Sequence, residues 1–489
     1  MTPRTQIAHI LRRFGLGASK AELDLYEPLG VDAALEKLLN YESTDEGFPV
    51  SPWELCFDEG SKEVYLDPFR TVTWWSLRLL LTKRPLQEKM TLFWHDHFAV
   101  SGTKIEFGPM MLDYLEALRK NATGNFRSLL GAASKTPAMI RWLDADENTK
   151  GMPNENFARE VMELFTIGIG NYTEKDVKEA ARAFTGWGLR YLVFERGGEK
   201  IQETAKDSIL KGRPMVAFSE TPDLYDDGVK TILGKTGKFD GDQVLDMLAS
   251  RPETARAISK KMWEFFAYPK PETTVVDRLA RVYTDSKGDI KAMIRAIAKS
   301  PEFWSENCLR AVVKSPADFT IPIVRQFGLS DFILSTRVQP KSVMTPLAKP
   351  MRDASGLIFG LMYKQGMLLL YPPDVSGWEG GQAWITSNNM LERIKTADAV
   401  FGTYDGQQPL AGWLSYLLTQ RKPPKSSADL VDALIENFDA PVPPEKRKVL
   451  INACDKSGGI EALASPKAAA VMFSAVCRLI FGSPEFQFC

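Results

Sequence analysis

The segment from residue 173 to residue 188 constrains the fold most, because it carries the full pattern of an amphipathic helix. Thr173 is suited to be the N-cap, and Asp176 completes a capping-box variant whose carboxylate also favours the positive end of a helix. Apolar side chains then recur at the three- and four-residue spacings of a core-facing stripe, at Val177, Ala180, Ala181 and Phe184. The sequence Gly186-Trp187-Gly188 predicts the end of this helix.

Similar periodicity recurs along the chain. It predicts further helices over residues 86–98, 154–165, 242–266 and 274–298. Prolines at 423–424 and 441–444 divide the last quarter into short helical pieces, because proline cannot continue a helix interior. The expected fold class is therefore mainly α, with one large multi-helix globular body.

One region departs from the helical pattern. Two apolar runs, Tyr191–Phe194 and Met215–Phe218, lie on either side of Gly197-Gly198, which is typical of a small β-hairpin. We therefore expect a β-hairpin excursion near residues 190–220. The chain then divides into an N-terminal helical region with the His/Glu motifs (1–188), a β-rich excursion (189–235), a helical middle region (236–345) and a C-terminal helical region with a Gly/Trp loop (346–489).

Charge and hydropathy exclude some classes of partner. The chain has 61 Lys and Arg against 62 Asp and Glu, a formal net charge of -1. Nucleic-acid binding usually needs a basic surplus, so we expect no nucleic-acid partner. The most apolar tract, 468–481, is too short to span a bilayer, and the first residues lack the apolar core of a signal peptide. The default expectation is a cytoplasmic protein without membrane attachment, which leaves room for a protein partner.

Histidine is the first place to look for chemistry, because it is the commonest metal ligand and the usual acid/base near neutral pH. The chain has only three histidines, His9, His95 and His97. Residues two apart on a helix point about 200° apart, so His97 shares the apolar stripe of its helix and His95 faces the other side. Two interpretations stay open. Either His97 is a hydrogen-bonded core residue and His95 a polar surface or interface residue, or a divalent metal ion uses one or both with ligands from elsewhere.

A second cluster lies on the predicted helix over residues 154–165. Asn156, Arg159, Glu160 and Glu163 fall within an arc of about 100° on this helix. Glu160 and Glu163 are candidate acid/base groups, and Arg159 is a candidate holder of an anionic substrate group. The alternative is a solvated face with weak ion pairs, each worth about 0.3–0.5 kcal/mol.

A third motif is the Gly/Trp-rich loop that follows Pro372-Pro373. Its tight turns and large aromatic faces place Trp378 either as the wall of a ligand pocket or as a plug into the core. The sequence contains no phosphate-binding loop, no G-x-S-x-G elbow and no H-E-x-x-H motif.

Taken together, these motifs resemble a large bacterial family catalogued as domain of unknown function 1800. The resemblance rests on five ordered segments, at residues 9–17, 88–98, 154–165, 176–187 and 372–378. It implies a mainly helical body and brings no assigned activity. Where the family often has a His-Asp pair before a G-x-K-x-x-x-G stretch, this chain has Tyr225 and Asp226 ahead of Lys230.

The leading hypothesis is an enzyme-like pocket where the His95/His97 segment meets the Glu160/Glu163 helix, with metal-assisted or general acid/base chemistry. The alternative is a non-catalytic helical scaffold or partner-binding protein whose polar cluster is structural. The candidate residues are, as catalytic groups, Glu160, Glu163 and Arg159; as binding groups, Asn156, Asp226, Lys230, Trp187 and Trp378; and as metal ligands, His95 and His97.

Overall fold

The computed structural model describes residues 1–192, 198–402, 409–421 and 423–489. These residues form a mainly α-helical fold with two small two-stranded sheets, which confirms the expected fold class. No helix among the described residues is both long enough and apolar enough to cross a membrane.

The N-terminal part is entirely helical. Its helices are α1 (Pro3–Phe14), α2 (Lys20–Tyr26), α3 (Val31–Leu39), α4 (Pro68–Leu81), α5 (Pro85–His97), α6 (Gly108–Lys120), α7 (Phe126–Ser134), α8 (Pro137–Trp142), α9 (Asn156–Glu163) and α10 (Glu174–Ala183).

The middle part contains the strands. Its elements are β1 (Trp187–Tyr191), α11 (Gly198–Lys211), β2 (Val216–Glu220), β3 (Lys230–Ile232), β4 (Lys235–Gly237), α12 (Gly241–Ala249), α13 (Pro252–Phe266), α14 (Thr273–Asp285) and α15 (Ile290–Lys299).

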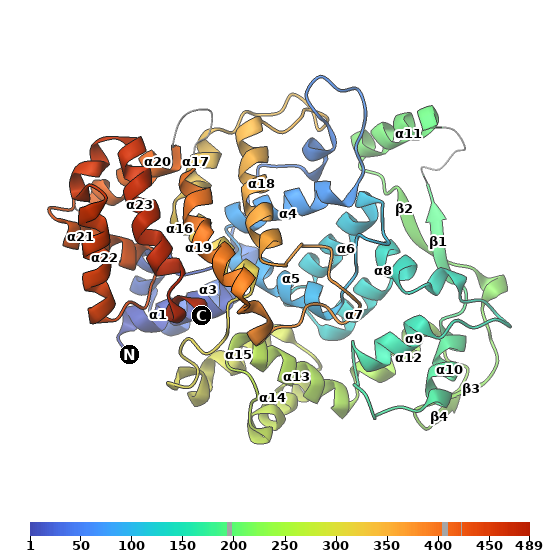
Figure 1. The fold of residues 1–489 in the computed structure, drawn as a ribbon. Helices are drawn as coiled ribbons and strands as arrows, with labels where there is room; N and C mark the ends of the chain where they lie inside the picture. Colours follow the sequence, from blue (N-terminus) through green and yellow to red (C-terminus); the bar gives the residue numbers. More distant parts are fainter. Residues whose placement is uncertain (193–197, 403–408, 422) are drawn as a thin grey trace.

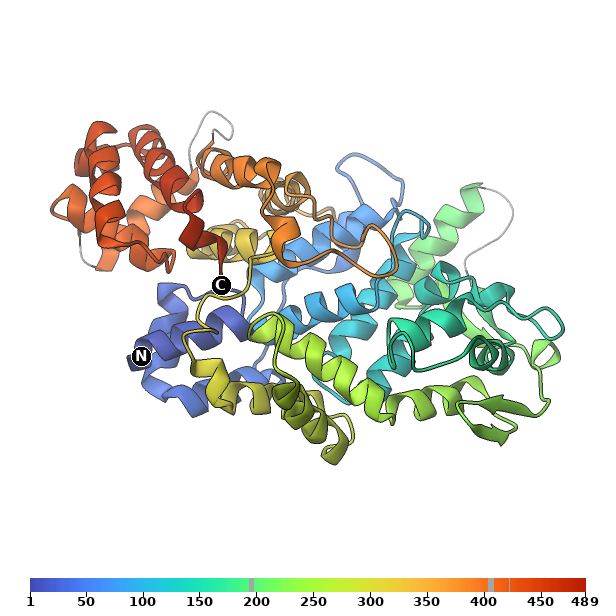
Figure 2. The ribbon, with the colours of Figure 1, turned by 60° about the horizontal axis from the view of Figure 1, so that its bottom comes forward.

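The C-terminal part is helical again. Its helices are α16 (Pro316–Gln326), α17 (Leu329–Ser335), α18 (Lys349–Lys364), α19 (Ser387–Phe401), α20 (Pro409–Arg421), α21 (Ser427–Asn437), α22 (Pro444–Lys456) and α23 (Pro466–Phe481). Helices α20–α23 gather at one end of the molecule and the strands lie at the other (Figures 1 and 2).

Helix α5 lies in the interior of the molecule (Figure 1), and every residue of it except Asp96 is buried. Helices α4 and α6 pack against it, and α1 and α3 also contact it. One of the two interpretations made His95 a polar surface or interface residue, and its surface form is wrong, because both faces of this helix are covered and His95 is 0% exposed.

The expected β-hairpin exists as an antiparallel pair, with Trp187 opposite Glu220 and Tyr191 opposite Val216. The connection is not a tight turn, because α11 lies between the two strands. Residues 193 and 194 of the first expected strand lie outside the described residues. A second hairpin, β3–β4, was not expected, and it turns at Leu233 and Gly234, both at positive φ as a type I′ turn requires.

Two helices that the periodicity predicts as continuous are each divided. The helix expected over 242–266 breaks before Pro252, because a residue that precedes proline disfavours helical backbone. The helix expected over 274–298 breaks at Lys287 and Gly288, both at positive φ. A large hydrophobic cluster runs from Ile7 to Phe486, and a second, small one includes Ala205 and Met215. The division into four regions stays a prediction.

Candidate functional site

His95 lies in the buried interior, where both of its ring nitrogens have partners. Its Nε2 accepts a hydrogen bond of 3.0 Å from the backbone N–H of Leu370, and its Nδ1 lies 3.0 Å from the hydroxyl of Tyr114. Tyr114 in turn donates to the carbonyl of Phe98 at 2.8 Å. A backbone N–H can only donate, so His95 is the neutral tautomer with its proton on Nδ1.

His97 has partners on both nitrogens as well, and they come from other elements. Its Nε2 donates to the carbonyl of Phe165 at 3.2 Å, and its Nδ1 accepts from the ammonium group of Lys261 at 3.1 Å. Lys261 also donates to the carbonyl of Leu164 at 3.2 Å. A carbonyl can only accept and an ammonium can only donate, so His97 is neutral with its proton on Nε2.

Burial holds both imidazoles in the neutral form. It lowers the pKa of His95 to about 3. It also lowers the pKa of His97 well below its ordinary value, and the positive charge of Lys261 lowers it further. The two rings face different partners, and among the described residues no group of three or more His, Cys, Asp or Glu side chains is arranged to hold a metal ion.

Trp378 lies at the C-terminal end of α5. Its ring lies 5.3 Å from the ring of His95, and its backbone N–H donates to Asp96 Oδ1 at 2.9 Å. Gly377 precedes it at φ 89°, where a Cβ would lie 2.4 Å from Asp96 Oδ1 and 2.6 Å from the Asp96 carbonyl oxygen. The Gly/Trp loop therefore docks on α5 through a contact that only glycine allows.

The predicted carboxylate cluster on α9 lies at the half-exposed surface of the helix. Arg159 pairs with Glu174, with two contacts of 2.7 Å, and with Glu155 at 3.2 Å. Glu163 accepts a hydrogen bond from Tyr172. The side-chain carboxylate of Glu160 has no hydrogen-bond partner among the described residues, and its pKa is raised by burial and by the charge of Glu163.

Asn156 is the first residue of α9 and is half-buried. Its backbone N–H donates a hydrogen bond of 2.9 Å to Oδ1 of Asn154. The residues that follow α9 contact the histidine segment through their backbone. His97 donates to the carbonyl of Phe165, and Lys261 donates to the carbonyl of Leu164.

The remaining predicted binding residues gather at the end of α10. Asp226 accepts from Arg182 at 2.7 Å, which lowers the pKa of its carboxyl to about 2. Lys230 is 0% exposed and donates to the carbonyl oxygens of Asp226 and Gly228. Trp187 lines a neighbouring open cavity of about 270 Å³, together with Tyr225.

Asp96 and Lys261 are the polar groups of this region that the sequence interpretation missed. Asp96 stands between the two histidines, so its place in the motif could have drawn attention to it. Lys261 lies 164 residues away from His97 along the chain, and no local pattern indicates that it reaches the imidazole.

The fold and these clusters define a class of protein: a large helical body in which the polar residues of the sequence motifs are mostly bonded to one another and to backbone groups. Its family is established by comparison. The chain belongs to the family described as "Protein of unknown function (DUF1800)", which it matches over residues 9–488. No curated protein and no solved structure shows significant similarity to it.

Proposed function

We propose that this chain is a non-catalytic helical binding protein in which His95 and His97 are structural residues. One observation carries the proposal: all four ring nitrogens have hydrogen-bond partners, and each set of partners requires a neutral ring. Such fully satisfied polar groups fix the mutual positions of the elements that supply them.

If His95 or His97 bound a metal ion, it would lose one of these hydrogen bonds. A metal ion needs the lone pair of a ring nitrogen, and in His95 that lone pair accepts from Leu370 while in His97 it accepts from Lys261. Ligation would leave a buried backbone N–H without a partner in the first case, which costs about 1–3 kcal/mol. Acid/base work near neutral pH is disfavoured too, because burial keeps both pKa values low.

The test replaces each histidine with alanine. We expect His95→Ala and His97→Ala each to lower the free energy of unfolding by about 2–5 kcal/mol, because each leaves buried groups unpaired and creates a cavity. Chemical denaturation measures the loss, and elemental analysis of the purified proteins measures bound metal. Exposed Lys395, replaced by methionine, is the matched control and should unfold like the original protein. A variant that keeps its stability but loses a stoichiometric metal would overturn the proposal.

A second candidate function is general acid/base chemistry on α9, favoured by the unpaired, half-buried Glu160 with its raised pKa. The negative charge of Glu163 would keep the pKa of Glu160 raised. Arg159 would release Glu174 and bind an anionic group of the substrate in its place. In this version Glu160→Gln leaves stability unchanged or increases it, since functional carboxylates commonly cost stability. A loss of 2 kcal/mol or more in chemical denaturation would instead assign Glu160 to the structure.

A further inference from the structure

A small cavity of about 30 Å³ lies where five distant parts of the chain meet. The end of α1 and the turn after it form one side, and the segment before α16 with α16 itself forms another. Leu92 of α5, the residues that follow α21 and the last residues of the chain complete the lining. None of the residues that the sequence motifs pointed to as site residues lies in it.

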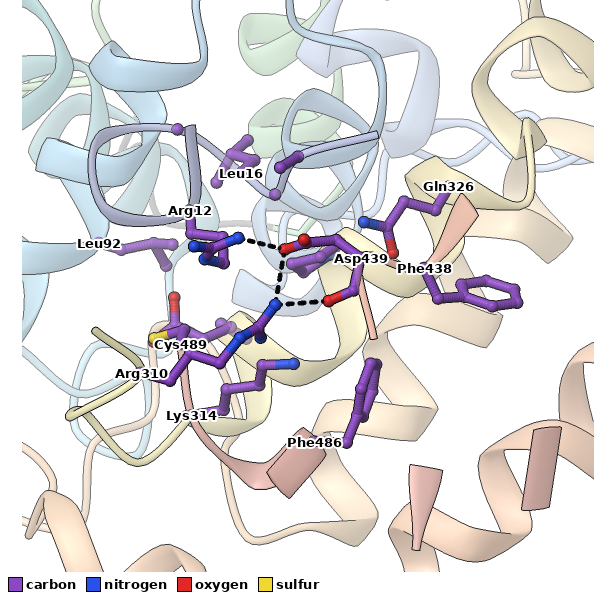
Figure 3. A pocket seen from close by; sticks show the side chains of 16 residues that line it. Arg12, Leu16, Leu92, Arg310, Lys314, Gln326, Phe438, Asp439, Phe486 and Cys489 are labelled. Atoms are coloured by element: carbon purple, nitrogen blue, oxygen red, sulfur yellow. Dashed lines mark hydrogen bonds and ion pairs between the residues drawn. The ribbon is translucent and has the colours of Figure 1, made fainter. Parts of the chain in front are cut away.

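Three basic side chains line the cavity. Arg12 donates to Asp439 Oδ2 at 2.6 Å, and Arg310 donates to the Asp439 carbonyl at 2.7 Å and lies 3.1 Å from its Oδ2 (Figure 3). Lys314 is the third cation, and it is 6% exposed. The other lining carboxylate, Asp318, is already paired with Lys89. The three cations therefore face the carboxylate of Asp439 and the negative charge that Cys489 contributes.

The positive charge continues behind the lining. Arg13 and Arg393 are fully buried nearby. Arg393 donates to a backbone carbonyl and to side-chain amides, and Arg13 donates to the carbonyls of Phe266 and Ala267 and to Cys489. Arg393 donates to the carbonyl of Lys314 itself at 2.7 Å. A group of like charges with so few counter-charges costs free energy unless an anion joins it.

Several polar atoms in this lining are buried and have no partner. They are Arg12 Nε, Arg310 Nη1 and Gln326 Oε1. The ammonium group of Lys314 lies 3.7 Å from the centre of the Phe486 ring and has no hydrogen-bond acceptor among the described residues. Buried polar atoms in native proteins are almost always paired, so unpaired donors gathered at one cavity indicate a ligand or ion that they bind.

We propose that this cavity binds the carboxylate or phosphate group of a small molecule. Arg12 and Arg310 supply guanidinium N–H groups, whose planar arrangement suits oxyanions, and Lys314 supplies a point charge. Gln326 accepts a hydrogen bond from a hydroxyl on the ligand. The cavity holds about two water molecules, so it accommodates the anionic group while the rest of the ligand lies outside. This inference rests on the proposed binding function and names its ligand class.

The site should also respond to pH. Burial and the charge of Arg310 lower the pKa of Lys314 to about 7, and the other groups around it are Asp439, Cys489 and Arg393. A bound anion favours the protonated lysine, so binding takes up a proton near neutral pH. We expect a non-titrating anion to bind roughly tenfold more tightly at pH 6 than at pH 8.5.

The experiment is calorimetric titration of the full chain with sodium sulfate and with sodium acetate, with sodium chloride at matched ionic strength as reference. Sulfate represents the phosphate-like ligand and acetate the carboxylate. We expect at least one of them to bind, and Lys314→Met to weaken that binding at pH 6 about tenfold and to abolish its pH dependence. The control Lys395→Met removes an exposed lysine of the same half of the chain and should bind like the original protein.

Two results would overturn the site. The first is no binding of either oxyanion at tens of millimolar, and the second is binding that Lys314→Met leaves unchanged. If Lys314→Met does not fold, the same titration is made with Arg12→Lys, and unchanged binding again overturns the site. This variant keeps the charge and the pairing with Asp439 but loses the unpaired Nε. The histidine variants are judged by stability and metal content, so their outcome is independent of this one.

Discussion

At the scale of single residues, the surroundings of His95 are fixed by close backbone contacts, one of which only glycine can make. Gly377 sits against Asp96 with left-handed backbone, and this contact brings Trp378 onto His95. Leu370, also at positive φ (63°), directs its N–H to His95. These residues lie more than 270 positions from the histidine along the chain, so the sequence around His95 could not predict its partners.

Gly377→Ala tests the docking of the loop. The added methyl group would meet Asp96 at 2.4 Å and 2.6 Å, and the φ of 89° is unfavourable for alanine. We expect a loss of about 2 kcal/mol or more in the free energy of unfolding. Gly380→Ala in the same loop is the matched control, because a Cβ there meets nothing within 4 Å, and its stability should change little. Equal stability of the two variants would contradict the docking.

At the scale of elements, local patterns predicted α5, α9 and α10 within a few residues, because helix periodicity and capping are properties of short segments. The predicted capping box of Thr173 and Asp176 is present. What the patterns could not predict is which helices surround α5. Its buried Glu88 accepts hydrogen bonds from Trp75 and Arg78 of α4 and from Arg119 of α6.

Glu88→Gln tests this junction of three helices. Burial alone would raise the pKa of Glu88, but Arg119 and Arg78 lower it, so the group is a buried carboxylate with charged partners. Removing the charge of Glu88 should lower the free energy of unfolding by about 3–5 kcal/mol, because Arg78 and Arg119 stay buried but lose the carboxylate that they share. Glu116 pairs with the same Arg119 from a more exposed position, and Glu116→Gln should cost less than about 1 kcal/mol. Chemical denaturation compares the two variants, and similar losses would argue against the junction.

At the scale of the whole molecule, the larger hydrophobic cluster joins segments from both ends of the chain. The unpredicted oxyanion cavity belongs to this scale. Arg12, Arg310 and Asp439 are scattered along the sequence, and nothing local marks them as neighbours. The mainly helical class could be predicted from periodicity, whereas the assembly of such a cavity depends on long-range packing.

Acid should destabilise the molecule through its neutral histidines. Their pKa values are lowered in the folded state, to about 3 for His9 and His95, so the unfolded chain binds more protons below pH 6.5. Stability is therefore complete above pH 6.5 and is lost as the pH falls. Between pH 6.5 and pH 5 each of these histidines should cost about 2 kcal/mol, measured by urea denaturation. His95→Gln should make the profile shallower, and a flat profile of the original protein would be inconsistent with buried neutral imidazoles.

His95 and His97 of α5 are neutral structural groups with fixed tautomers. Nitrogen NMR of histidine-labelled protein measures this directly, since the chain has only three imidazoles to assign. We expect a proton on Nδ1 of His95 and on Nε2 of His97 at pH 7, with no change when zinc or manganese is added. Ring nitrogens that titrate near pH 6.5, or that shift on addition of metal, would contradict it.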